Sequence, residues 1–239
     1  MESRVIIYDM QRKTELAVGE YYHIYSRGVE KRKIFDNHRD YLRFLVLLYL
    51  SNSHQEIHLG DYVQRNLLLE DLFDEELSEN LISVGSYCLM PNHFHLLVRE
   101  KTENGISTFM RKLLTGYSMY YNKKNERTGP LFEGRFKAKH AGEDRYLEYL
   151  FSYIHLNPVK LFDHDWRDNR NIDLEGVKKF LSDYPYSSYL FYCGQSRPED
   201  KILDHKEFPE YFQNPHDFRS FIDSWLNFSS EELEEYESN

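Results

Sequence analysis

Two apolar runs of this chain, residues 81–89 and 94–98, lie on either side of a short connection that contains Pro91 and Asn92. Both runs are rich in β-branched, aromatic and other apolar residues, which is typical of strands. Proline and asparagine between two such runs favour a tight turn. We therefore predict two neighbouring strands that pair antiparallel.

The segments around this strand pair alternate between strand and helix patterns. Residues 21–26 have the pattern of a short strand, and residues 131–141 alternate like another one. Three segments have helical spacing: 38–50, 105–125 and 144–156. The last of them ends before Pro158, because the residue before a proline avoids the α region. This order is similar to the ferredoxin-like split βαβ arrangement. We predict an α+β fold, an antiparallel sheet with helices on one face.

The chain is expected to divide into a domain of residues 1–162 and a helical and loop extension of residues 163–239. An insertion at about residues 54–80 interrupts the first domain; residues 56–79 hold eight acidic side chains and one basic one. Its leucines keep helical spacing, which predicts an inserted helical piece. The extension ends in an acidic tail, with five acidic residues in 231–237.

Composition excludes several classes of protein. The 239 residues are 41% hydrophobic, enough for a core. A run of about 18 apolar residues is lacking, as is an apolar leader with a cleavage site, so we predict a cytoplasmic protein with no membrane partner. The cysteines, Cys88 and Cys193, are too few for a disulfide framework.

Charge is segregated along the sequence. The net charge of -10 argues against a nucleic-acid ligand if it is averaged over the molecule. Residues 101–145, however, hold ten basic and five acidic side chains. This segment has the charge to face an anion, although a solvated basic surface fits the same count.

His93 and His95 lie two residues apart in the second predicted strand. Alternate residues of a strand point to the same face, so both imidazoles aim at one point, as two ligands of a metal would. The pair alone is a weak signal, because structural histidines are common. A second feature is needed to support a metal site.

That feature is a tyrosine and an asparagine near the end of the last predicted helix. Tyr153 and Asn157 stand four residues apart and share one helix face, which brings a hydroxyl beside an amide oxygen able to complete a metal site. In a chain with 20 tyrosines, core packing is the alternative for Tyr153. His155 points elsewhere and is a weaker ligand candidate.

Two groups of basic residues are candidates for DNA contacts. Arg135, Lys137 and Lys139 alternate along the predicted strand at 131–141, as a ridge that follows phosphates would, although an edge strand kept soluble by charge gives the same pattern. The second-rank candidates lie at the end of the long helix, where they also suit a helix C-terminus: Lys123, Lys124 and Arg127.

Three segments together resemble one family: CLMPNHFHLLV at 88–98, GPLFEGRFKA at 129–138 and RYLEYLFSYIHLNPVK at 145–160. They are similar to the REP-associated tyrosine transposases, relatives of the insertion-sequence transposases with one catalytic tyrosine, within the HUH superfamily of single-strand nucleases. The resemblance covers about residues 21–189, which makes residues 1–162 an expected HUH-type domain. The acidic insertion and the acidic tail depart from the core of the family.

The resemblance implies a role for each candidate residue. His93, His95 and Asn157 would hold a divalent ion, Mg or Mn. Tyr153 would be the nucleophile, with Tyr149 and Tyr146 of the same helix as rivals. A free tyrosine hydroxyl has a pKa of about 10, so it needs a metal or a base to react at neutral pH. Only Tyr153 has the matching asparagine four residues later.

The implied function is that of a metal-dependent single-stranded DNA endonuclease and strand transferase, which acts on hairpin-forming palindromic DNA through a 5′-phosphotyrosine. The alternatives are a catalytically idle regulator that binds DNA hairpins on the same fold, and a structural metal in a protein of another function. Single-stranded or hairpin DNA is the expected partner. Close relatives include both homodimers and monomers, so the oligomeric state stays open.

Overall fold

The computed structural model describes residues 14–55, 68–169 and 171–228 together with Tyr236. At the centre of these residues lies a four-stranded antiparallel sheet with strand order β2-β3-β1-β4. Its strands are β1 (Tyr21–Arg27), β2 (Ile82–Met90), β3 (His93–Glu100) and β4 (Lys137–His140). β2 and β3 form the predicted antiparallel pair around Pro91 and Asn92, and the α+β class is confirmed.

The register of β1 against β3 gives the two faces of the sheet different contents. Ile24 pairs with Leu96, and both side chains enter the core on one face. Because side chains alternate along a strand, the neighbouring pairs point to the opposite face. One of these is Tyr25 with His95, and another is Arg27 with His93. Tyr25 and Arg27 of β1 and His93 and His95 of β3 thus share one face.

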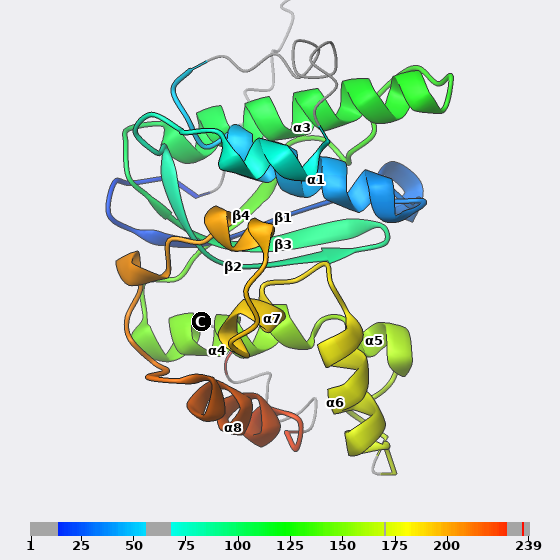
Figure 1. Cartoon of the computed structure of the whole chain (residues 1–239), viewed down its shortest axis with the longest axis vertical. Helices are drawn as coiled ribbons and strands as arrows, with labels where there is room; N and C mark the ends of the chain where they lie inside the picture. The colour runs from blue at the N-terminus through cyan, green and yellow to red at the C-terminus, as the bar shows by residue number, and fades with distance from the viewer. Residues whose placement is uncertain (1–13, 56–67, 170, 229–235, 237–239) are drawn as a thin grey trace, which may run out of the picture.

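Helices α1 (His38–Leu50) and α3 (Gly105–Lys124) cover the face of Ile24 and Leu96 (Figure 1). α1 begins at a capping box, in which the Asn37 side chain accepts the Asp40 N–H and the Asp40 side chain accepts the Asn37 N–H. The predicted helices at 38–50 and 105–125 are confirmed. Their apolar faces and this side of the sheet form one core cluster.

The opposite face is covered by α4 (Asp144–Leu156), which packs against β2 and β3. Helices on both faces correct the expectation of helices on one face only (Figure 1). The physical reason is that Cys88 and Leu97 point to this second face and need cover as much as their neighbours do. All nine residues of β2 are buried, which is typical of a strand with apolar layers on both sides.

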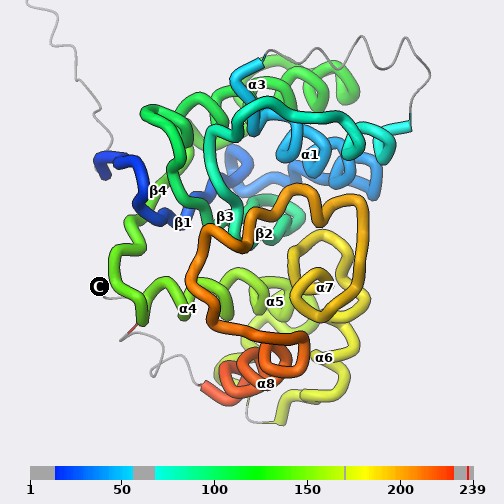
Figure 2. The backbone as a smooth tube through the Cα atoms, turned by 60° about the vertical axis from the view of Figure 1, so that its left-hand side comes forward, coloured from blue at the N-terminus to red at the C-terminus, as the bar shows by residue number. Residues whose placement is uncertain are grey.

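The C-terminal segment, which the structure describes from residue 159 to 228 except residue 170, continues this second layer with α5 (Val159–Phe162), α6 (Leu174–Asp183), α7 (Tyr189–Tyr192) and α8 (Pro215–Trp225). Its chain also covers the outer edge of β2, since the Leu89 N–H donates to the carbonyl of Tyr186 and the Asp204 N–H donates to that of Val84, each over 2.9 Å. Figure 2 shows this segment passing beside β2 before it reaches α8. The boundary between residues 162 and 163 stays a prediction.

One expected element is shorter in the structure, and another is only partly described. The strand predicted at 131–141 is regular only over Lys137–His140, because Gly129 and Gly134 adopt left-handed backbone angles and break the alternation before it. Of the predicted helical insertion, residues 56–67 lie outside the described residues, and the part that follows holds the short 3-10 helix η2 (Glu70–Asp74). Apart from Tyr236, the acidic tail also lies outside the described residues.

Three further 3-10 helices connect these elements: η1 (Val29–Lys31), η3 (Pro198–Ile202) and η4 (His205–Glu207). Across the described part of the chain, no helix combines the length and the apolar character needed to cross a membrane.

Candidate active site

A pocket of about 290 Å³ opens between the central strands and the end of α4. β1, β3 and β4 contribute its floor, while α4 and the start of α5 contribute a wall. The lining combines imidazole, amide, phenol and cationic groups: Tyr25, Ser26, Arg27, Asn92, His93, His95, Glu133, Arg135, Lys137, Tyr153, Asn157 and Lys160. Four residues predicted from the sequence to form the site, His93, His95, Tyr153 and Asn157, therefore meet in one pocket.

His93 is oriented by its neighbour Asn92. The Asn92 side-chain nitrogen donates to the carbonyl of Lys31 over 3.1 Å, so the side-chain oxygen of Asn92 faces His93. That oxygen lies 2.6 Å from Nδ1 of His93 and accepts its hydrogen. Because Nδ1 carries the hydrogen, Nε2 of His93 keeps a lone pair that can bind a metal.

His95 is buried, and its Nδ1 lies 2.8 Å from Nε2 of His23 on the neighbouring strand. The two rings stack at 5.0 Å between centroids. Sequence reasoning missed His23. The only signal for it was its place in the first predicted strand, and its pairing with β3 depends on the sheet register.

Both candidate ligand imidazoles are neutral at neutral pH. Burial, with a contribution from the cations Lys160 and Arg27, lowers the pKa of His93 to about 4. Burial and the neighbouring histidines also place the pKa of His95 well below its ordinary value. Neutral imidazole is the form that binds metals, so these rings need not release a proton to do so.

Asn157 caps the C-terminus of α4 and is 3% exposed. Its side-chain nitrogen donates to the carbonyl of Tyr153 over 2.8 Å, which sets the orientation of the amide. The side-chain oxygen is then the atom that can serve a metal ion in the pocket. Pro158 ends the helix at this point, which places the amide at the edge of the sheet face that carries His93 and His95.

The donor set fits a divalent ion. Among the described residues, no three His, Cys, Asp or Glu side chains are grouped so as to hold a metal ion. The Asn157 oxygen is one oxygen donor that the pocket offers beside the two imidazoles. Two imidazole nitrogens and one amide oxygen suit Mn²⁺ better than Mg²⁺, which prefers oxygen ligands and water.

Tyr153 stands against the histidines. Its ring meets His95 edge to face, with 5.4 Å between centroids, and lies 5.5 Å from the ring of His23. The rival tyrosines are placed differently. Tyr149 is 1% exposed and packs on Trp225, while Tyr146 is buried with Lys139 Nζ 4.5 Å from its ring centroid. Neither rival lines the pocket.

Cationic side chains surround the pocket. Arg135 and Lys137 line it, and Lys139, two residues after Lys137 in β4, has its ammonium over Tyr146. Two more cations in the lining, Arg27 and Lys160, were missed. Arg27 pairs with Glu133 over 3.1 Å, and only the register that sets Arg27 opposite His93 reveals its place.

The second group of predicted DNA contacts lies elsewhere. Lys123 and Lys124 end α3 and Arg127 follows it, on the other side of the sheet, and none of the three lines the pocket. The Lys124 ammonium donates to both carboxylate oxygens of the buried Asp40, over 2.6 and 2.8 Å. The charge of Lys124 thus stabilises the fold. A DNA contact by Lys123, Lys124 and Arg127 stays a prediction.

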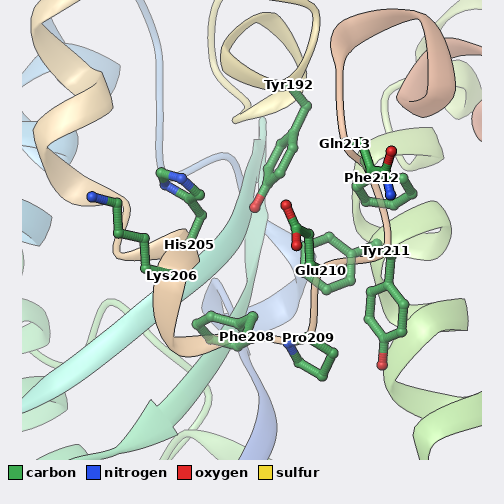
Figure 3. Close-up of a pocket in the computed structure, with 10 residues that line it drawn as sticks. Tyr192, His205, Lys206, Phe208, Pro209, Glu210, Tyr211, Phe212 and Gln213 are labelled. Atoms are coloured by element: carbon green, nitrogen blue, oxygen red, sulfur yellow. The ribbon is translucent and has the colours of Figure 1, made fainter.

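A larger hollow of about 450 Å³ is lined by Phe151 of α4 and by side chains from the C-terminal part of the chain (Figure 3). Its lining is mostly aromatic, with Tyr192, Phe208, Tyr211 and Phe212 around it. It lacks the combination of a tyrosine, paired imidazoles and several cations. The smaller pocket is therefore the stronger candidate for chemistry on a phosphate.

Comparison with known proteins identifies the family. The model of the family described as "Transposase IS200 like" matches residues 18–157, which include every element of the sheet and all four core residues of the pocket. The chain belongs to the IS200-like transposase family. The resemblance to insertion-sequence transposases found in the sequence is thereby confirmed.

Two solved structures match the chain at low identity. One is a REP-associated tyrosine transposase bound to a REP hairpin, with 13% identity, a TM-score of 0.46, and coverage of 77% of this chain and 86% of that one. Another is tRNA(His) guanylyltransferase from Saccharomyces cerevisiae, with 8% identity, a TM-score of 0.34, and coverage of 92% and 84%. No curated protein matches the chain.

Proposed function

We propose that this IS200-like transposase cleaves and rejoins single-stranded DNA at hairpin-forming palindromes, with Tyr153 as the nucleophile. The observation that carries the proposal is the placing of the three helix tyrosines. Tyr153 shares a pocket with two neutral imidazoles, an amide oxygen and several cations, whereas Tyr149 and Tyr146 are buried outside it. The preference for hairpins rests on the motif resemblance.

The reaction is a transesterification at one phosphate. The Tyr153 oxygen attacks phosphorus and gives up its proton, while the bond from phosphorus to the 3′ oxygen breaks and that oxygen takes up a proton. The products are a 5′-phosphotyrosine and a 3′-hydroxyl, and attack by another 3′-hydroxyl reverses the step. The bond energy is kept in the phosphotyrosine, so no nucleotide cofactor is needed.

The residues of the pocket divide the work. His93, His95 and Asn157 would hold a divalent ion, Mn²⁺ or Mg²⁺, which when bound neutralises charge on the phosphate and orients it. Arg135, Lys137 and Lys160 are placed to hold backbone phosphates on either side of the reacting one. The His95 ring holds the Tyr153 ring edge to face, which limits where the phenol oxygen can point.

The test is an adduct assay with labelled single-stranded hairpin oligonucleotides and Mn²⁺, followed by a denaturing gel and mapping of the modified peptide. Wild-type protein should form a covalent adduct on Tyr153. Tyr153→Phe should bind the same hairpins and form no adduct. Tyr149→Phe is the matched control, because it removes one hydroxyl four residues away on the same helix and should leave the adduct intact.

An adduct mapped to Tyr149 or Tyr146 would overturn the assignment of the nucleophile and keep the chemistry. Tight hairpin binding without any adduct would overturn the proposal of enzymatic activity and favour a catalytically idle regulator that binds DNA hairpins on the same fold.

A further inference from the structure

His23 makes a buried contact that joins the candidate metal site to β1. Its Nε2 lies 2.8 Å from Nδ1 of His95, and both side chains are 6% exposed. At this separation a hydrogen lies between the two nitrogens, so one ring donates and the other accepts. Neighbouring rings also hold the His23 ring in place, because it stacks on Tyr25 and meets Tyr153 edge to face.

The direction of this hydrogen bond decides what His95 can do. If His23 donates, Nδ1 of His95 is the acceptor, and the hydrogen of the neutral His95 ring sits on Nε2, where it blocks a metal. If His95 donates from Nδ1, its Nε2 carries a lone pair toward the pocket. The same condition already holds at His93, whose Nδ1 donates to Asn92. Metal-binding histidines commonly have a partner of this kind on their second nitrogen.

We propose that His23 is a positioning residue that accepts the Nδ1 hydrogen of His95 and so holds Nε2 of His95 ready for a divalent ion. The proposal rests on the metal site of the proposed function. His23 does not bind the ion itself, because its Nε2 is occupied by His95. His23 affects the affinity of the site for the ion and the orientation of the His95 ring, and it does not contact the phosphate.

The contact brings together residues that are 72 positions apart in the sequence. It forms because β1 pairs with β3 in the register that sets Tyr25 opposite His95, and His23 lies one alternate position along β1 on the same face. A shift of one residue in this register would send His23 to the other face and leave His95 without this partner.

The experiment measures Mn²⁺ binding by electron paramagnetic resonance on the full chain without DNA. His23→Phe keeps an aromatic ring for packing and removes the acceptor, and we expect the Kd for Mn²⁺ to rise by about 10- to 100-fold. His23→Gln places an amide oxygen near the former Nε2 and should restore most of the affinity. His38→Phe is the control, since it removes an exposed histidine that bonds to Tyr186 outside the pocket.

A second measurement needs no metal. Long-range ¹H–¹⁵N spectra of the histidine rings should place the hydrogen of His95 on Nδ1 in the wild type, with the peak assigned from His95→Gln. An unchanged Kd in His23→Phe, or a hydrogen on Nε2 of His95, would overturn the role of His23 alone. Failure of the wild type to bind Mn²⁺ would overturn the metal site and, with it, the role of His23.

Discussion

Neighbouring residues of the same type, such as Lys123 and Lys124, have different roles in the folded protein, and the contacts of Asp40 show the reason. Its carboxylate is 0% exposed and accepts hydrogen bonds from Lys124, from the Tyr120 hydroxyl and from the Asp36 N–H. Burial works against ionisation, but these bonds outweigh it and hold the pKa of Asp40 below its usual value. Lys124 therefore stabilises the fold through its ion pair with Asp40, whereas the neighbouring Lys123 does not bind Asp40.

Asp40→Asn should lower the free energy of unfolding by about 1.5–3 kcal/mol at pH 7, because the variant cannot form these charged hydrogen bonds. The folded pKa lies below the ordinary 3.8, so the contribution is complete above that value and is lost as pH falls through the folded pKa. The difference between wild type and variant should therefore be constant from pH 7 to about 5 and shrink below about 4. Urea titrations at several pH values measure it.

Asp36→Asn is the control for this prediction, since Asp36 is half-exposed and lies 3.4 Å from the same ammonium. A surface pair of this kind contributes about 0–1 kcal/mol. Equal losses of stability in the two variants would contradict the central role of Asp40.

At the scale of elements, β1 and β3 carry Arg27 and the histidines of the pocket, α4 brings Tyr153 to it, and β4 brings Lys137. α4 carries its tyrosines along one side: Tyr149 is buried against Trp225 and Tyr146 is buried beside Lys139, whereas Tyr153 lines the pocket. β4 pairs with β1 so that Lys137 lies opposite Tyr25 and Lys139 opposite His23. Both lysines are thereby on the face of the histidines.

Lys137→Gln should weaken binding of single-stranded DNA and reduce the slope of log K against log salt by about 0.7, the value expected when the protein neutralises one phosphate fewer. Lys123→Gln removes the same charge from the end of α3, outside the pocket, and should leave the slope unchanged. Fluorescence anisotropy over a range of salt concentrations gives both slopes. A larger effect at Lys123 would move the DNA path to the other side of the sheet.

The whole molecule is organised as two apolar layers that share one sheet. The layer under α4 includes side chains from the C-terminal segment, such as Phe218, which contacts His155 and Tyr192. His155, which the sequence left as a weak ligand candidate, is buried there with its Nε2 2.7 Å from the Ser188 hydroxyl. The C-terminal segment thus helps to hold the helix that carries Tyr153.

Phe218→Ala should lower the free energy of unfolding by about 3–5 kcal/mol, as expected for a fully buried phenylalanine. Because the sheet is common to both layers, loss of tryptophan fluorescence from Trp166 and Trp225 should coincide with loss of the far-ultraviolet signal. Phe221 is half-buried on the same helix, so Phe221→Ala should lower the free energy of unfolding by less than Phe218→Ala does. Separate transitions would instead support an independent unit after residue 162.

The order of strands and helices, the turn at Pro91 and the pairs His93 with His95 and Tyr153 with Asn157 could all be predicted from the sequence, because each depends on spacing within a single strand, helix or turn. The tertiary structure alone decided which face α4 covers, that His23 contacts His95, that Arg27 and Lys160 join the pocket, and that Lys124 is bound by Asp40. These features depend on strand register and on packing between distant segments. Side chains far apart in the chain carry no local periodicity that reveals their contact, so only the folded molecule selects it.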